Sequence, residues 1–250
     1  MKTLIIRPGG IGDCILCFPA MECLRSAYTE VWVPSAIVPL VQIADAVKSI
    51  ASSGIDVVGL PGRPLPSRLR EFDRIVSWYG ENRPEFREAV AGLPFEFHQA
   101  LPPASSPLHA TDFFLRQIGA PPGAVPRLDV PVVSTSSTVI HPFSGSSKKN
   151  WPLENFRQVA SQLPYVQWLA GPEETLEGAT QLDNLLDVAN LILGAKRYIG
   201  NDSGITHLAA FAGAPVIAIF GPSDPRIWAP RGRNVQILVS PTPEDVLRLC

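Results

Sequence analysis

Polar residues suited to binding an anion interrupt an otherwise apolar stretch over residues 198–221. The pattern predicts a strand that ends near Ile199, a helix over residues 204–212 and a second buried strand over residues 216–220. Such a turn leaves the first backbone N–H groups of the helix without internal partners and places the positive end of the helix dipole there. Both features favour an anionic ligand such as a diphosphate.

The residues at this helix start are Asp202, Ser203 and Gly204, and His207 follows one helical turn later on the same side. We predict that these four residues bind a diphosphate. An alternative stays open, in which Asp202 and Ser203 only cap the helix.

A second stretch, between a strand predicted at residues 138–141 and a helix predicted at residues 153–163, is rich in small, hydroxyl and basic residues. Small residues let the backbone approach a ligand, hydroxyl groups donate hydrogen bonds, and lysines supply positive charge. The order of the residues differs from that of a Walker A loop. We predict a phosphate-binding loop with the candidate residues Ser144, Gly145, Lys148 and Lys149. The alternative is a flexible basic surface loop.

A third stretch is a glycine-rich turn between a strand predicted at residues 3–6 and a helix predicted at residues 14–27. Gly10 and Gly12 shape this turn, and Asp13 follows them at the carboxyl end of the strand, where α/β sheets keep their sites. Asp13 is either a helix N-cap alone or a catalytic carboxylate, and the residues favour the two interpretations equally. The third small residue of the dinucleotide fingerprint is missing, so we do not expect NAD to bind here.

Cysteine and histidine placement gives no sign of a metal or redox site. Cys14 and Cys17 have the spacing of a thioredoxin motif, but we interpret them as small apolar residues of a core helix. The four histidines are scattered and form no cluster at metal-ligand intervals. We therefore predict no metal site and no cofactor.

Composition excludes several classes of partner. The chain has 250 residues, 46% of them hydrophobic, a net charge of -2 and a pI of about 6.1, so it lacks the basic footprint of a nucleic-acid-binding protein. No apolar run approaches the roughly 20 residues of a membrane span, and Met1 leads into a strand pattern instead of a signal peptide. We expect a cytoplasmic protein with at most peripheral contact with the inner face of a membrane.

Strand and helix patterns alternate along the chain, which predicts a doubly wound α/β fold. Further strands are predicted at residues 30–33, 55–60, 74–78, 94–97, 166–170 and 235–239, and further helices at residues 110–118, 183–193 and from residue 243. The segment over residues 119–138 is rich in Pro, Gly, Ser and Thr and is the best linker candidate. We predict two domains, residues 1–133 and residues 134–250.

Three blocks of the sequence stand out together. They run from Ile5 to Asp13, from His141 to Pro152, and from Asp202 to His207 with the downstream segment from Phe220 to Pro225, and a Gly-Pro-Glu-Glu turn lies between the second and third blocks. In this order the blocks resemble glycosyltransferase family 9, typified by the ADP-heptose:lipopolysaccharide heptosyltransferases.

This resemblance implies a GT-B architecture, in which two Rossmann-like domains face one another across a cleft and the C-terminal domain holds the donor. It also implies an inverting transfer without a metal ion. Asp13 looks like the general base, in a loop with Gly10 and Gly12 on the acceptor side, and Lys149 like the lysine that stabilises the departing diphosphate. Ser144 is similar to a hydroxyl donor beside that lysine, and Glu173 to the acid that contacts the nucleoside. The set Asp202, Ser203, Gly204 and His207 matches the nucleotide-sugar signature.

The leading hypothesis is therefore a transferase that moves a heptose-like sugar from a nucleotide-diphosphate donor, ADP-linked by resemblance, to a glycan or lipopolysaccharide-type acceptor. Two alternatives remain. One is a homologue that binds nucleotide or glycan without transferring sugar, and the other is a nucleotide-sugar epimerase or hydrolase on the same fold.

Overall fold

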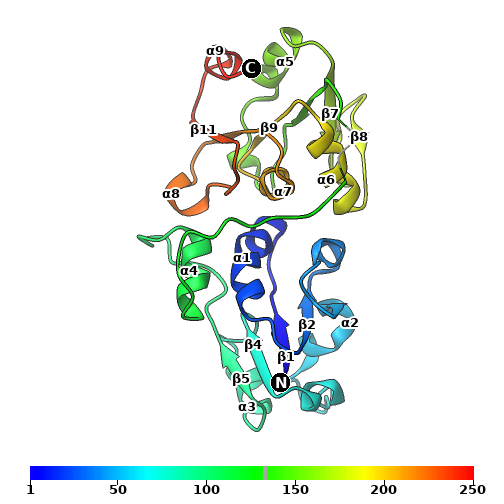
Figure 1. Cartoon of the computed structure of the whole chain (residues 1–250), viewed down its shortest axis with the longest axis vertical. Helices are drawn as coiled ribbons and strands as arrows, with labels where there is room; N and C mark the ends of the chain where they lie inside the picture. Colours follow the sequence, from blue (N-terminus) through cyan, green and yellow to red (C-terminus); the bar gives the residue numbers. More distant parts are fainter. Residues whose placement is uncertain (132–133) are drawn as a thin grey trace. The chain divides into compact units, whose positions relative to one another are not determined.

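The computed structural model describes residues 1–131 and 134–250, which form two compact units (Figure 1). The first unit comprises Met1–Ser106 and Ala110–Ala124, and the second comprises Pro107–His109 and Val125–Cys250. The boundary predicted between residues 133 and 134 falls beside residues 132–133, which lie outside the described residues.

A five-stranded parallel sheet forms the centre of the first unit. Its order is β3 (Ala46–Ser49), β2 (Tyr28–Val33), β1 (Lys2–Ile6), β4 (Arg74–Ser77) and β5 (Phe95–Phe97). Leu4, Ile5 and Ile6 of β1 are fully buried, as expected for a central parallel strand covered on both faces. The strand order is that of a Rossmann fold.

The helices of the first unit are α1 (Ile11–Cys23), α2 (Ile50–Ser53), α3 (Pro84–Ala89) and α4 (Ala110–Gln117), and 3-10 segments span Ser35–Leu40, Ile55–Val57 and Ser67–Glu71. The helix predicted to run to residue 27 ends at Cys23. The hydroxyl of Ser26 donates to the Tyr28 carbonyl, and the Ser26 N–H donates to Thr29 Oγ1, which turns the chain into β2.

The strand predicted at residues 55–60 is wrong. This segment begins as a 3-10 turn, and β3 pairs with β2 instead. Gly54 and Gly59 flank the turn with φ of +72° and +88°, a left-handed conformation that interrupts an extended strand. A short apolar run does not by its periodicity distinguish a strand from such a turn.

A six-stranded parallel sheet forms the centre of the second unit. Its order is β11 (Val235–Val239), β10 (Val216–Phe220), β9 (Arg197–Asn201), β6 (Thr138–His141), β7 (Val166–Ala170) and β8 (Thr180–Gln181). The predicted strands at residues 138–141, 166–170, 216–220 and 235–239 are confirmed to the residue. Numbered from its own first strand, this sheet again has the Rossmann order.

The helices of the second unit are α5 (Leu153–Ser161), α6 (Leu185–Gly194), α7 (Gly204–Ala212), α8 (Pro225–Trp228) and α9 (Pro243–Leu247), and a 3-10 turn spans Ser147–Lys149. Predicted helix 204–212 is confirmed as α7. The helix predicted from residue 183 begins two residues later, because the side chain of Asn184 caps it by accepting from the Leu186 N–H at 2.8 Å.

In each sheet the chain order reverses between neighbouring strands, β1 and β4 in the first unit and β6 and β9 in the second. Crevices at the carboxyl ends of such strand pairs are where doubly wound sheets bind ligands. The predicted site residues lie in the loops and first helical turns that follow β1, β6, β7 and β9. Among the described residues, no helix is long and apolar enough to cross a membrane.

Candidate active site

An ion pair joins two of the predicted site residues at the start of α7. Lys149 Nζ lies 2.7 Å from Asp202 Oδ2, and the Asp202 side chain is only 4% exposed. The other carboxylate oxygen of Asp202 lies 4.0 Å from His207 Nε2. The structure thus brings Lys149, Asp202 and His207 together, although 53 residues separate the lysine from the aspartate.

Ser203 is the N-cap of α7, and its hydroxyl oxygen accepts a hydrogen bond from the Thr206 N–H at 3.3 Å. Capping is therefore shown for Ser203, whereas the Asp202 side chain pairs with Lys149 instead. The Ser203 cap occupies only the Thr206 N–H. The N–H groups of Gly204 and Ile205 have no intrahelical partner, because no helical turn precedes them. They are available to an anion at this end of the helix.

The start of α7 is fixed to β9 by a buried hydroxyl cluster. Thr206 Oγ1 lies 3.1 Å from the Tyr198 hydroxyl and donates to the Asn201 carbonyl. Burial raises the pKa of Tyr198, so the phenol stays protonated. Gly200 is required here, because a Cβ atom would collide with the Tyr198 ring.

The loop of residues 142–151 is anchored at both ends by Asn201. The side-chain amide nitrogen of Asn201 donates to the Pro142 carbonyl at 2.8 Å, and the side-chain amide oxygen of Asn201 accepts from the Trp151 N–H at 2.9 Å. The Ser144 hydroxyl lies 2.7 Å from Asn150 Oδ1 within the loop. These bonds hold the two ends of the loop, while residues 145–148 between them are exposed, so the phosphate-binding loop stays a prediction and the flexible surface loop stays its alternative.

The two glutamates after β7 differ in their surroundings. Glu173, the predicted nucleoside contact, is exposed, whereas Glu174 turns inward and accepts from His141 Nε2 at 2.9 Å and from the Gly171 N–H at 2.6 Å. Burial raises the pKa of Glu174, but the hydrogen bonds from His141 and Gly171 and the charge of His141 outweigh it, so the pKa lies below its ordinary value.

Sequence reasoning missed His141 and Glu174 as a pair. His141 is the last residue of β6 and is 2% exposed, and Glu174 follows the adjacent strand β7. A polar residue at the end of each of two neighbouring parallel strands was the available signal.

Asp13 of the first unit lies in the first turn of α1 and is half-buried. Gly10, not Asp13, is the N-cap residue, and Asp13 Oδ2 accepts from the Gly10 N–H at 3.0 Å. Gly9 has a φ of +116°, and a Cβ atom there would lie 3.0 Å from the Asp13 Cβ. Together with Gly12 inside the first turn, these glycines let the backbone fold closely around a carboxylate that closes the turn.

Cys14 and Cys17 of α1 are buried core residues, whereas Cys23 at the end of the helix is exposed. Burial raises the pKa of both Cys14 and Cys17 to about 12, against a smaller opposing effect of the Arg7 charge, so both thiols are protonated near neutral pH. This confirms their interpretation as small core residues. In the described ranges, no group of three or more His, Cys, Asp and Glu side chains could hold a metal ion.

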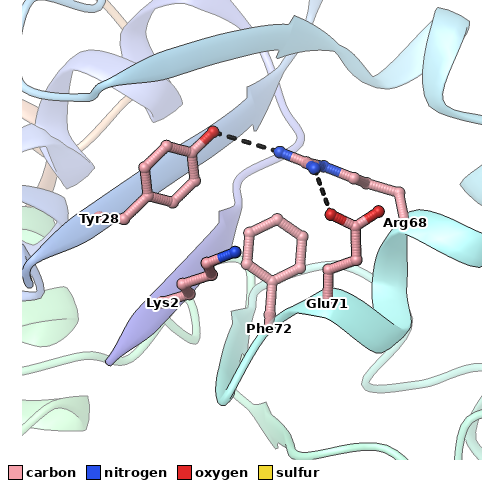
Figure 2. Close-up of a pocket in the computed structure, with 5 residues that line it drawn as sticks. All are labelled: Lys2, Tyr28, Arg68, Glu71 and Phe72. Atoms are coloured by element: carbon pink, nitrogen blue, oxygen red, sulfur yellow. Dashed lines mark hydrogen bonds and ion pairs between the residues drawn. The ribbon is translucent and has the colours of Figure 1, made fainter.

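A cavity of about 230 Å³ lies elsewhere in the first unit, lined by Lys2, Tyr28, Arg68, Glu71 and Phe72 (Figure 2). Lys2 and Tyr28 are the first residues of β1 and β2, so this cavity lies at the amino-terminal ends of the strands. Asp13 follows the carboxyl-terminal end of β1, at the opposite side of the sheet. Figure 2 shows the Arg68 guanidinium between the Tyr28 hydroxyl and the Glu71 carboxylate. The cavity is therefore separate from the Asp13 turn.

The profile of glycosyltransferase family 9 (heptosyltransferase) matches residues 120–246, just over half of the chain. The chain belongs to glycosyltransferase family 9. The matched range contains the Lys149 loop, the Glu174 turn and the start of α7, and the resemblance seen in the sequence is thereby confirmed.

Curated relatives include lipopolysaccharide heptosyltransferase 1 of Salmonella typhimurium, 31% identical over 112 residues, which are 37% of this chain and 34% of the relative. The corresponding Escherichia coli K12 protein is 29% identical over 117 residues, 40% of this chain and 36% of the relative. The aligned part of the chain thus spans about a third of the length of these relatives.

Solved heptosyltransferase structures resemble almost the whole chain. Escherichia coli ADP-heptose lps heptosyltransferase II has a TM-score of 0.77 at 18% identity, covering 99% of this chain and 97% of that one. E. coli heptosyltransferase WaaC with ADP-2-deoxy-2-fluoro heptose has a TM-score of 0.68 at 17% identity, covering 100% and 98%. The predicted GT-B type fold, built from two Rossmann-like parallel-sheet units, is confirmed.

Proposed function

We propose that this family 9 protein is an inverting, metal-independent glycosyltransferase that acts in the cytoplasm. Its donor is an ADP-linked, heptose-like sugar and its acceptor a glycan or lipopolysaccharide-type glycolipid. The observation that carries the proposal is the placement of Lys149, through its ion pair with Asp202, beside the open N-terminus of α7.

In this proposal the donor diphosphate binds at the start of α7. The N–H groups of Gly204 and Ile205 donate to the phosphate oxygens. Lys149 supplies a positive charge, and its ion pair with Asp202 orients the ammonium group. The exposed backbone at Gly145 adds a donor from the Lys149 loop, and Lys148 adds positive charge. The Ser144 hydroxyl donates to a phosphate oxygen once it turns away from Asn150 Oδ1.

The nucleoside half of the donor binds beside the turn after β7 in this proposal. Glu173 is exposed there and can accept from ribose hydroxyls, while Glu174 and His141 hold the turn in place. His207 lies one helical turn into α7 and, when protonated, adds charge next to the diphosphate.

The chemical step is a single displacement at the anomeric carbon. The acceptor oxygen attacks that carbon and gives its proton to the Asp13 carboxylate, while the bond from the carbon to the diphosphate oxygen breaks. Negative charge grows on the departing diphosphate, and Lys149 with the α7 N–H groups stabilises it. A single displacement inverts the configuration, which is why we propose an inverting enzyme.

The solved relatives support the choice of donor and acceptor. WaaC has been solved with ADP and with a fluorinated ADP-heptose, and the curated relatives act, by their names, on lipopolysaccharide. Because the donor-side residues lie within the matched range, ADP-heptose is the first donor to test.

The test is thermal unfolding of the protein with ADP, UDP, GDP, CDP or NAD, each with and without EDTA. ADP at about 100 times its dissociation constant should stabilise the native state by about 2.7 kcal/mol, and EDTA should leave this shift unchanged.

ADP-heptose is then incubated with the protein, with and without a heptose-deficient lipopolysaccharide. Sugar transfer only in the presence of acceptor is expected. Conversion of donor alone would favour an epimerase or hydrolase, and nucleotide binding without either reaction would favour a silent homologue.

A further inference from the structure

Arg7 is a fully buried arginine directly after β1, in the turn that leads to Asp13. The side chain is 0% exposed, and no carboxylate among the described residues lies within ion-pair distance of it. A guanidinium does not lose its charge in a protein, because its pKa is too high. The first unit therefore buries a positive charge without an ion-pair partner.

Three contacts compensate for this burial. One guanidinium nitrogen donates to the backbone carbonyl of Asp13 at 2.9 Å, and a second donates to the carbonyl of Ala100 at 3.0 Å. The guanidinium carbon lies 4.6 Å from the centre of the Phe114 ring of α4. Nε has no hydrogen-bond partner. One side chain thus connects the end of β1, the first turn of α1, the loop after β5 and α4.

These contacts are specific to an arginine. Burying a charge without an ion pair costs stability, and an apolar side chain of similar volume would fill the space at lower cost. A fork that donates to two carbonyls from different segments fixes their positions relative to each other, which an apolar residue does not do. One of the two carbonyls belongs to Asp13 itself.

We propose that Arg7 is a positioning residue for the Asp13 carboxylate. By holding the Asp13 carbonyl and the Ala100 loop, Arg7 fixes the first turn of α1, so that the carboxylate keeps its hydrogen bond with the Gly10 N–H and its orientation. The contribution of Arg7 to turnover rests on the proposed function, in which Asp13 is the base. The positioning of the turn does not.

The test compares Arg7→Met, Arg7→Lys and a control, Arg74→Met. Arg74 is in the same unit, but its guanidinium pairs with Glu96 on the surface, at 2.7 Å. The kcat of Arg7→Met, expressed per ADP-binding site, should be about 100-fold lower than that of the wild type, as expected when a reacting group is misplaced. The KM for the donor should stay within about twofold, because Lys149 and α7 lie in the second unit.

The conservative variant separates positioning from general support of the fold. Arg7→Lys keeps the charge but has a single donor atom, so its kcat should be about tenfold higher than that of Arg7→Met and still below that of the wild type. Arg74→Met should keep the wild-type kcat. Wild-type kcat in both Arg7 variants, or a donor KM that rises in step with the loss of kcat, would overturn the proposal.

A second measurement does not depend on sugar transfer. Exchange of the Gly10 amide hydrogen, followed by NMR, should speed up about tenfold or more in Arg7→Met relative to the β1 and β2 amides, because its bond with Asp13 is no longer held. The proposal is wrong if Gly10 exchanges at the wild-type rate in the folded Arg7 variants. If the wild-type protein transfers no sugar but Gly10 responds, the transferase proposal fails and the positioning role stands. If Arg7→Met does not fold, Arg7→Lys carries both measurements.

Discussion

At the residue scale, the proposed site contains carboxylates whose surroundings suit each to a different task. Asp202 is nearly buried and holds Lys149, Glu174 is held by His141 and the Gly171 N–H, and Asp13 uses one oxygen to close its own turn. Asp202 and Glu174 are engaged in orienting other groups. Asp13 is therefore the carboxylate we assign to proton transfer.

Replacing Asp13 by Asn keeps the side-chain shape but removes the base. We expect Asp13→Asn to retain the wild-type dissociation constant for ADP and to lose about 10²- to 10⁴-fold in kcat, the usual contribution of a general base. Asp73→Asn is the control, because Asp73 accepts from the Lys2 N–H at the opposite strand edge. Calorimetry and a transfer assay measure the two quantities, and unchanged turnover in Asp13→Asn would exclude Asp13 as the base.

Acidification should weaken the contribution of Glu174 to folding. The pKa of Glu174 in the folded protein is below the ordinary value of 4.5, so the carboxylate stabilises the fold at pH values above about 4.5 and loses this effect as the pH falls through the folded value. Denaturant unfolding at several pH values should show Glu174→Gln to be about 1 kcal/mol less stable than wild type near pH 7, with the difference shrinking below pH 4.5.

The neighbouring glutamate provides the control for that experiment. Glu173 is exposed, and Glu173→Gln should follow the wild-type stability at every pH. Equal effects of the two substitutions would mean that Glu174 has no special contact with His141.

At the scale of elements, α7 combines a structural cap with an open N-terminus. Ser203 satisfies one first-turn N–H, while Tyr198 and Thr206 fix the helix start to β9. The helix therefore presents its remaining N–H groups from a rigid position. Rigid donors cost little reorganisation when a diphosphate binds.

Removing the cap should affect both stability and ligand binding. Ser203→Ala should cost about 1 kcal/mol of the free energy of unfolding, because the Thr206 N–H loses its acceptor, and should weaken ADP binding. Thr242→Ala is the matched control, since Thr242 caps α9 through the Asp245 N–H at the same distance of 3.3 Å. It should cost a similar amount of stability and leave the dissociation constant for ADP unchanged. If both variants bind ADP with equal affinity, the Ser203 cap does not contribute to the proposed ADP site.

At the scale of the whole molecule, two sheets with the same strand order carry different halves of the proposed chemistry. The proposed donor-binding residues come from the second unit, and the proposed base comes from the first. Each group lies at the carboxyl end of a sheet where the chain order reverses. The repeated topology explains why both units offer a loop suited to a ligand.

Binding of ADP alone should protect amides of the second unit. In hydrogen exchange, we expect slower exchange over residues 141–151 and 201–207 and no change over residues 7–13, because the proposed phosphate-binding residues all lie in the second unit. In the Lys149→Met variant, this protection should be weakened at equal ADP concentration. Protection restricted to residues 7–13 would contradict the assignment of the donor site.

Much of the second unit could be predicted from its sequence alone. Strands β6, β7, β10 and β11 and helix α7 match their predicted bounds, because continuous apolar runs bounded by Gly, Pro and polar residues give a clear local signal. In the first unit the same reasoning failed at residues 55–60, where two glycines in left-handed conformations decide the local structure.

The sequence by itself determined the family, the alternation of strands and helices, and the residue types that follow each strand. Only the tertiary structure decided the partners: Lys149 with Asp202, His141 with Glu174 in place of the exposed Glu173, and Arg7 with the Asp13 carbonyl. Periodicity and turn chemistry are local and act over a few residues. These pairs depend on which strand ends lie side by side and on which direction each side chain takes, and both are fixed by packing between segments far apart in the chain.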